Sequence, residues 1–448
     1  MKKFIESISN VWKIEELKNR ILMTLGLLLI YRFGAQVTLP GIDATQLANL
    51  AGQTKDGIGS ILDMFTGGAF SQASVFALGI MPYISASIVV QLMGMAIPYL
   101  QKLQSDGESG RKKINQITRW LTIGITLLQG PTYIYNLYRT LPANAFLLGF
   151  NSFEFLFSSV IILTTGTIFA MWLGEKITDK GIGNGISLLI MVGILARLPQ
   201  AFIQEFTTRV TNNNGGPMLL VIEIIVWLLV IISCVLLVMA VRKIPVQYAR
   251  RTTTGDYEQD LMGGNRQWIP LKLNAAGVMP IIFAQAIMFI PAAVAGLSKS
   301  DASQSIVGAF SNMFGFWYNI VFATLIVVFT FFYTAITVPT NKMSDDLKRS
   351  GGFIPGVKPG VETSDFLDKV MSLITFPGSL FLALIAVFPA IVVSVMDVQQ
   401  SWAMFFGGTS LIIMVGVAID TMQQINSYLL NQHYDGLMKT GKNRKAVA

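Results

Sequence analysis

The sequence predicts an all-α polytopic membrane protein with ten transmembrane helices in two inverted five-helix repeats. Its 448 residues are 52% hydrophobic and 13% charged, with a mean hydropathy of +0.57. That is too little charge for the soluble domains that a chain of this length would otherwise form. Ten apolar runs long enough to cross a bilayer and two pairs of repeated motifs are the other observations behind this prediction.

The ten apolar runs are separated by short polar or charged segments, as in a multi-pass membrane protein. They occupy residues 21 to 39, 74 to 97, 119 to 137, 153 to 174, 184 to 204, 217 to 241, 273 to 296, 317 to 338, 371 to 395 and 407 to 430. No small-residue cleavage site follows the first run, so we expect it to stay as a span rather than be removed as a signal peptide.

Basic residues between the runs predict the orientation. All but six of the 33 Lys and Arg residues lie on one alternate set of segments: the N-terminus, 98 to 119, 175 to 183, 242 to 272, 339 to 370 and the tail. The six on the opposite set are Arg32, Lys55, Arg139, Arg197, Arg209 and Lys299. The positive-inside rule therefore places both termini and the long loops 242 to 272 and 339 to 370 in the cytosol.

Two pairs of motifs indicate a duplicated chain. Gly79-Ile80-Met81-Pro82 in span two returns as Gly277-Val278-Met279-Pro280 in span seven, and the run 187–194 in span five returns as 410–417 in span ten. Each copy has five spans, which is an odd number, so the second copy enters the membrane in the opposite orientation. Proteins with such inverted repeats have their functional centre near the bilayer midplane. The predicted halves are 1–204 and 205–448, the second ending in a cytosolic tail, 431–448.

The midplane is poor in charge, whereas ion-coupled transporters place charged ligands beside broken helices. We expect the charges near span ends to reach an interface; they are Arg32, Glu175, Arg197 and Asp420, and Glu223 lies near the start of span six. The repeated motifs instead present isoleucine, at Ile80, Ile84, Ile186, Ile190, Ile282 and Ile413. If the halves face each other, these side chains converge on one apolar constriction that bars ions yet yields to a passing chain. The alternative is ordinary packed or lipid-facing isoleucines.

The Gly-X-Met-Pro motifs are interpreted as points where spans two and seven bend or separate, because proline loosens helical hydrogen bonding. Candidate residues of such a seam are Met81, Pro82, Ser85, Ser87, Gln91, Gln129, Met279, Pro280 and Gln285. Ordinary hydrogen bonding between packed helices is the alternative for the polar ones.

No residues for enzyme chemistry or a cofactor are evident. His433 is the sole histidine, which excludes an intramembrane Ser-His dyad and a multi-histidine metal site. The stretch 436–443 falls short of a phosphate-binding loop, because Asn443 stands where Ser or Thr is needed and no strand precedes it. The glycines at 181, 183 and 185 are better placed for a tight cytosolic turn.

Six strings occur in the order typical of one family. They are FALGIMPYISASIVVQL (76–92), GESGRKKINQITR (107–119), MWLGEKITDKGIGNGIS (171–187), PLKLNAAGVMP (270–280), LKRSGGFIPGVKPG (347–360) and FGGTSLIIMVG (406–416). Along almost its whole length the chain thus resembles the SecY family, the large subunits of the bacterial protein-conducting channel.

The resemblance implies a passive channel of the bacterial inner membrane that passes unfolded secretory polypeptides and signal peptides, and releases hydrophobic segments sideways into the lipids. It implies SecE and SecG as small subunits, the family's pore ring at the six isoleucines, and a lateral gate between spans two and seven, and three and eight. It also implies a plug at residues 57–72, including Ser60, Ile61, Leu62, Met64, Phe65, Gly67 and Gly68. This segment is too short to span, and its glycine pair offers a hinge. Gln72 stands where many members carry a basic residue.

The resemblance further implies that the long loops dock the SecA ATPase and the ribosome, through Arg250, Arg251, Lys348, Arg349 and Lys358. Lys358 stands at a position where arginine is frequent in the family. Lysine keeps the positive charge but lacks the planar guanidinium that forms bidentate hydrogen bonds. The alternative is that these charges only set topology. As a function of another class we retain an ion-coupled secondary transporter with inverted repeats.

Overall fold

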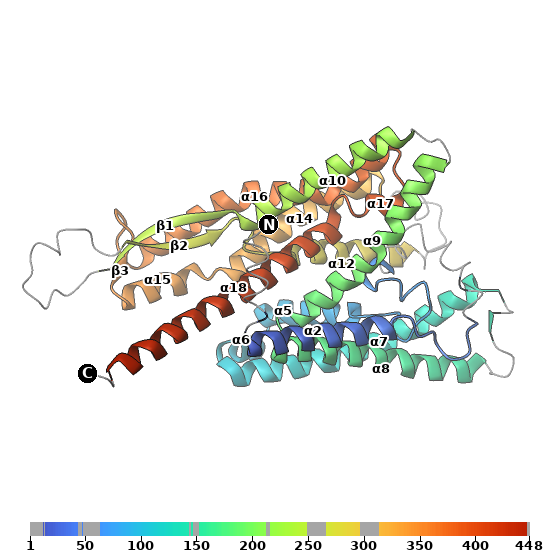
Figure 1. The fold of residues 1–448 in the computed structure, drawn as a ribbon, viewed down its shortest axis with the longest axis horizontal. Helices are drawn as coiled ribbons and strands as arrows, with labels where there is room; N and C mark the ends of the chain where they lie inside the picture. The colour runs from blue at the N-terminus through green and yellow to red at the C-terminus, as the bar shows by residue number, and fades with distance from the viewer. Residues whose placement is uncertain are drawn as a thin grey trace, which may run out of the picture. The chain divides into compact units, whose positions relative to one another are not determined.

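Ten helices of the computed structural model each overlap one predicted span, which confirms the predicted fold class. Within the chain the structure describes residues 12, 14–43, 47, 63–142, 145–146, 152–211, 216–248, 266–295 and 313–445. The ten helices are α2 (Glu15–Gly34), α5 (Met81–Ala96), α7 (Gly107–Thr140), α8 (Ser152–Lys180), α9 (Gly185–Thr211), α10 (Gly216–Met239), α12 (Met279–Ala295), α14 (Phe316–Thr337), α16 (Val361–Met396) and α18 (Gly408–Lys445) (Figure 1).

Several of these helices suit a bilayer by length and composition. Of the described residues, six helices are long and apolar enough to cross a membrane. A seventh is added if α5 and the short helix α6 (Pro98–Ser105), bent by 104° where they meet, count as one broken span. Large apolar side chains such as Leu228, Leu229 and Ile232 of α10 are exposed, as on a helix that faces lipid.

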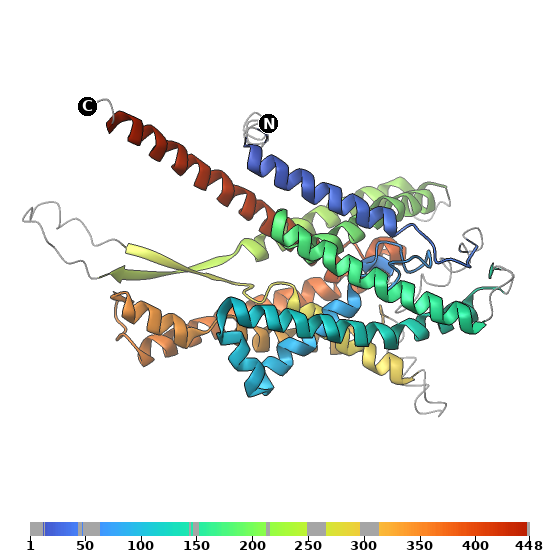
Figure 2. The same ribbon diagram turned by 90° about the horizontal axis from the view of Figure 1, so that it is seen from below.

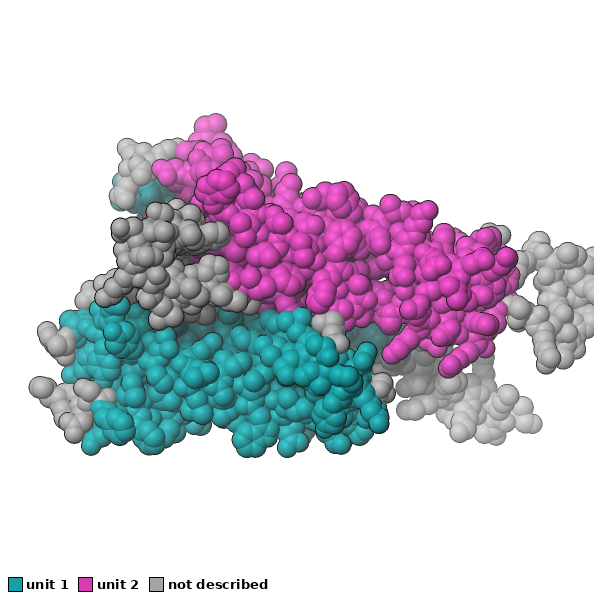
Figure 3. Space-filling view, turned by 180° about the vertical axis from the view of Figure 1, so that it is seen from behind, with its two compact units in different colours: residues 1–214, 400–402, 417–448 teal, residues 215–399, 403–416 magenta. Residues whose placement is uncertain are grey.

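The chain forms two compact units, coloured separately in Figure 3. Unit 1 holds residues 1–214, 400–402 and 417–448, and unit 2 holds 215–399 and 403–416. In unit 1, α7 and α8 pack along each other, and α2 and α9 also pack on α8; Figure 2 shows the same elements from below.

The turn between α8 and α9 follows the sequence prediction. The side-chain oxygen of Asn184 accepts hydrogen bonds from the backbone N–H groups of Ile186 (3.2 Å) and Ser187 (3.4 Å), and so caps the start of α9. Thr24 of α2 adds a further contact, since its hydroxyl oxygen accepts a hydrogen bond from the N–H of Ile182 at 3.1 Å.

Unit 2 contains a small sheet within the long loops, which the helical prediction did not include. β1 (Val241–Tyr248) pairs antiparallel with β2 (Arg266–Lys272) and with the two-residue strand β3 (Gly352–Phe353), in the order β2-β1-β3. Apolar side chains of β1 and β2 pack on α15 (Thr340–Arg349) and on α16. The core of this region consists of Ile244, Val246, Leu271, Leu347, Ile354, Leu367 and Met371. The described parts of both loops therefore fold onto one apolar core.

Spans two and seven start later than the sequence suggests. Residues 75–80 and 273–278 are turns, Gly79 (φ 53°) and Gly277 (φ 63°) are in the left-handed region, and the helices begin at Met81 and Met279. The motifs therefore lie at the starts of these helices and not within them, and their role in letting the two spans bend or separate stays a prediction. Pro82 lies in the first turn of α5, where its missing N–H removes no helical hydrogen bond.

Candidate functional site

Residues 63–80, here called the buried segment, run through unit 1 with hardly any regular structure. After a short helical turn at 63–65 the backbone forms turns up to α5, yet nearly every residue is buried, and Gln72 is the exposed exception. Irregular backbone at membrane depth is tolerated only where protein or a water-filled cavity surrounds it, because lipid satisfies no polar group. The segment's position therefore depends on partners from the neighbouring helices.

One partner is Arg197 of α9, which binds the start of the buried segment. Its guanidinium forms an ion pair with the carboxylate of Asp63 and donates a hydrogen bond to the hydroxyl of Ser71 at 2.9 Å. Asp63 in turn accepts a hydrogen bond from the N–H of Ser71 at 2.8 Å. The Asp63 side chain is 9% exposed and that of Arg197 27% exposed, so water screens the pair only partly.

A second partner is Arg32 of α2. Its Nη1 donates a hydrogen bond to the backbone carbonyl oxygen of Gly67 at 2.9 Å. Gly67 (φ 66°) and Gly68 (φ 96°) are both left-handed, and a Cβ on Gly67 would stand 2.5 Å from Arg32 Nη1. Gly67 and Gly68 were predicted as a hinge. Because Gly67 has no side chain, the guanidinium of Arg32 can also approach the backbone at this point.

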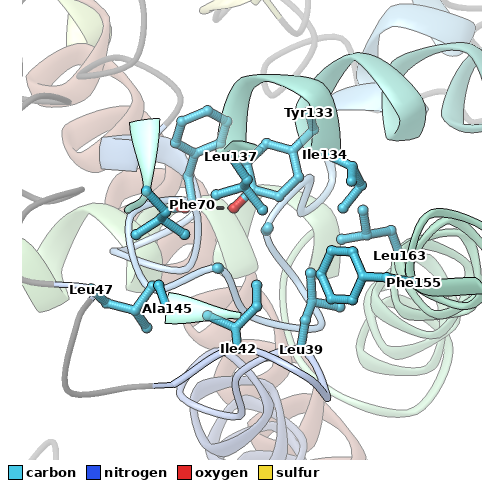
Figure 4. Packing of buried hydrophobic residues seen from close by; sticks show 13 residues of the cluster. Leu39, Ile42, Leu47, Phe70, Tyr133, Ile134, Leu137, Ala145, Phe155 and Leu163 are labelled. Carbon is cyan, nitrogen blue, oxygen red and sulfur yellow. Dashed lines mark hydrogen bonds between the residues drawn. The ribbon is translucent and has the colours of Figure 1, made fainter. Parts of the chain in front are cut away.

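The third contact that holds the buried segment is apolar packing around Phe70. Phe70 belongs to a buried cluster with side chains from three parts of unit 1, shown in Figure 4. The hydroxyl of Tyr133 on α7 donates a hydrogen bond to the carbonyl oxygen of Phe70 at 2.8 Å, and the two rings lie 4.9 Å apart. The main members of the cluster are Leu39, Ile42, Leu47, Phe70, Tyr133, Ile134, Leu137, Ala145, Phe155 and Leu163.

Sequence reasoning missed the partners of the buried segment. Arg32 and Arg197, expected at an interface, both bind this segment, while Asp63, Ser71 and Tyr133 were not singled out at all. Charged residues are scarce in the apolar runs, and this scarcity could have indicated the contact. Asp63 lies in an apolar stretch, and Arg32 and Arg197 lie at the ends of other spans. Glu175, also expected at an interface, forms a two-point ion pair with Arg119, with hydrogen bonds of 3.1 and 2.5 Å.

Of the plug residues, Met64 and Phe65 are buried at 7% exposure, next to Gly67 and Gly68. Ser60, Ile61 and Leu62 lie outside the described residues.

The six isoleucines divide between the units, with Ile80, Ile84, Ile186 and Ile190 in unit 1 and Ile282 and Ile413 in unit 2. Ile80, Ile190 and Ile413 are buried, and Ile84, Ile186 and Ile282 are half-buried. The side chain of Ile186 lies against Gly174 of α8, where a Cβ would stand 2.9 Å from its Cγ1.

The residues of the predicted seam lie on three helices. Met81 and Pro82 start α5, and Met279 and Pro280 start α12. On α5 the Gln91 amide donates to the hydroxyl of Ser87 at 3.3 Å, a contact within the helix, while Ser85 is half-buried. Gln129 of α7 is exposed and Gln285 of α12 is buried.

The docking residues that the structure describes lie on the folded loops of unit 2. Lys348 and Arg349 end α15 and are exposed; Arg250 and Arg251 lie outside the described residues. Lys358 is 84% exposed and lies 3.5 Å from Glu362. The tip that carries Lys358 is fixed at its base, because the hydroxyl of Ser344 donates to the carbonyl oxygen of Gly360 at 2.5 Å.

These features define a class of protein: a multi-pass helical membrane protein with a repeated half and a short irregular segment lodged among the helices of one unit. The SecY family model matches residues 74–422, and the chain belongs to the SecY family. A protein translocase subunit SecY of Haemophilus influenzae is 40% identical over 430 residues, covering 95% of this chain and 94% of that protein. The counterpart in Thermotoga maritima is 38% identical over 446 residues, covering 98% and 99%.

Solved structures share the fold at low sequence identity. A structure described as a protein-conducting channel has a TM-score of 0.58 at 16% identity, with 92% of each chain covered. A SecY structure concerned with the plug domain and the closed channel has a TM-score of 0.59 at 17% identity, again over 92% of each chain. Sec61 from a canine ribosome-channel complex has a TM-score of 0.54 at 14% identity over 92% of each chain.

Proposed function

We propose that this chain is the central pore-forming subunit of a Sec translocase, a passive gated channel that passes unfolded secretory polypeptides and releases hydrophobic segments into the membrane. The observation that carries the proposal is the buried segment. Its residues 63–72, the described part of the predicted plug, are too few to span and too irregular to face lipid, yet they are lodged among helices, as expected of a removable seal. Full-length similarity to protein translocase subunits supports the same function. The comparisons lend no support to the transporter alternative.

In this proposal residues 57–72 form the plug, and the two halves 1–204 and 205–448 face each other around the pore. The ring isoleucines narrow it, because branched apolar side chains wet poorly and resist ions. The starts of α5 and α12, with Ser85, Ser87, Gln91, Gln129 and Gln285, belong to the lateral gate. Their positions at helix starts support a hinge between turn and helix rather than a bend within a helix.

The energy for translocation comes from partners, since the chain is a channel subunit and not an enzyme. Among the described residues no group of three or more His, Cys, Asp or Glu side chains could hold a metal ion. The loop region with Lys348, Arg349 and Lys358 docks the SecA ATPase or the ribosome, a role supported by the exposed charge of these residues and by the apolar core beneath them. SecE and SecG accompany the chain in the bacterial inner membrane, with both of its termini in the cytosol.

The pore is tested by photo-crosslinking within one helix. Replacing Ile190 of α9 with a photo-reactive residue should give adducts to a stalled secretory polypeptide. Ile203 on the same helix is 61% exposed and serves as the matched control, expected to react with lipid instead. Adducts at Ile203 without adducts at Ile190 would contradict the channel.

A further inference from the structure

We propose that Arg197 and Asp63 form an electrostatic latch that holds the buried segment in its closed seat, with Arg32 as a second, charge-to-backbone contact. The inference rests on the proposed role of residues 57–72 as a plug, of which 63–72 begin the buried segment, and it names the residues that set how firmly this part is held. The latch lies wholly within unit 1.

The geometry of Arg197 favours a latch over a simple surface pair. One guanidinium reaches both ends of a short loop, because it pairs with the Asp63 carboxylate and donates to the Ser71 hydroxyl. The loop is closed on itself as well: Ser71 donates through its N–H to Asp63 and through its hydroxyl to the carbonyl oxygen of Gly68, at 2.8 and 3.2 Å. Hydrogen bonds therefore tie the two ends of residues 63–71 together, and Arg197 fastens this loop to α9.

Charge explains why this fastening can be released. Asp63 is almost fully buried, so its carboxylate depends on Arg197 and on the Ser71 N–H for the interactions that water would otherwise provide. When the segment leaves its seat, both charged groups regain water, which offsets much of the lost attraction. An apolar contact of equal area would gain no such hydration free energy on opening, because exposing apolar surface to water is unfavourable.

Arg32 contributes differently. Its hydrogen bond goes to a backbone oxygen, so a change at Gly67 affects it through shape and not through charge. Gly68 likewise lies against Arg197, since a Cβ there would stand 3.2 Å from Arg197 Nε. The two left-handed glycines let both guanidinium groups approach the backbone of the segment.

The test measures the resting ion conductance of the full translocase complex in planar bilayers. Asp63→Asn and Arg197→Gln should each raise conductance about tenfold, which corresponds to ~1.4 kcal/mol of lost closure. The resting conductance of the double variant should not exceed that of the more conductive single variant, because both changes remove the same interaction. Arg139→Gln, which removes an exposed charge at the end of α7, should leave conductance unchanged.

A second measurement separates opening from misfolding. With Cys234→Ala as background, Met64→Cys places one thiol on the buried segment, which is 7% exposed at this position. Arg197→Gln should speed its labelling by a polar maleimide about tenfold, whereas the Arg139→Gln background should not.

Deletion of residues 63–70 distinguishes the latch from the plug. If the deletion raises conductance while both single variants conduct and label like the parent, the plug stands and the latch is overturned. If the deletion changes nothing, both the plug and the latch are overturned. The crosslinking experiment at Ile190 tests the pore in either case.

Discussion

Gly193 of α9 and Gly67 of the buried segment lie backbone to backbone. A Cβ on Gly67 would stand 2.8 Å from the Cα of Gly193, and a Cβ on Gly193 would stand 2.7 Å from the carbonyl oxygen of Phe65. Distances this short to backbone atoms leave no room for even one methyl group. The helix and the segment therefore fit closely because both carry glycine at the point of contact.

Gly193→Ala should loosen the buried segment. The new methyl group meets backbone rather than a flexible side chain, so we expect a cost of about 1–3 kcal/mol, more than the ~1 kcal/mol gained in helix propensity. Resting conductance in planar bilayers should rise. The repeat supplies the control: Gly416 is the counterpart in α18, and a Cβ there meets only Val278 Cγ1 at 3.5 Å. Gly416→Ala should be neutral or stabilising, and equal effects of the two changes would argue against the close fit.

Tyr133→Phe should lower the free energy of unfolding by about 1 kcal/mol, the usual net contribution of one hydrogen bond. The change removes the donor to the Phe70 carbonyl oxygen and keeps the ring contact. Thermal unfolding of the purified protein in detergent measures it. Tyr135 lies two residues on and is 64% exposed, so Tyr135→Phe should have no effect. A matching loss in both variants would show that the buried hydrogen bond is not the cause.

Pro82→Ala should change stability by less than about 1 kcal/mol, because proline in the first helical turn withholds no hydrogen bond. Ala86→Pro, one turn further into α5, should cost about 3 kcal/mol or more, since an interior proline removes a hydrogen bond and clashes with the preceding turn. Unfolding of both variants by heat provides the comparison. A gain of several kcal/mol from Pro82→Ala, as expected when an interior proline is removed, would contradict the placement of Pro82 in the first helical turn.

Lys358→Glu should weaken docking of the ribosome or of SecA to purified complexes by about tenfold, as expected when an exposed attractive charge becomes repulsive at an interface. Binding measured at low and high salt should show the difference shrinking as salt rises. Lys369→Glu reverses an exposed charge on α16 within the same unit and should change binding far less. Similar losses from both would indicate a general effect of net charge instead of a docking site at the tip.

The ten spans could be predicted because they depend on local composition. An apolar run of sufficient length forms a helix in a membrane whatever its neighbours are, since the helix satisfies its own backbone groups. The turn at residues 181–184 was equally predictable, because glycines and Asn184 encode it locally. The sheet of β1 and β2 could not be predicted in this way. Its paired residues, such as Ile244 and Ile269, are far apart in the sequence, and the stretch between them has no helical or strand periodicity that would indicate the pairing.

The sequence by itself determined the class of membrane protein, the number of spans, the repeated motifs and the family. Only the tertiary structure decided that Arg32 and Arg197 bind the buried segment, and that Gly193 but not Gly416 lies against another backbone. The physical reason is range. Burial in lipid acts on each stretch separately, whereas the partner of a single buried charge or glycine is set by residues that lie far away along the chain and meet only in the fold.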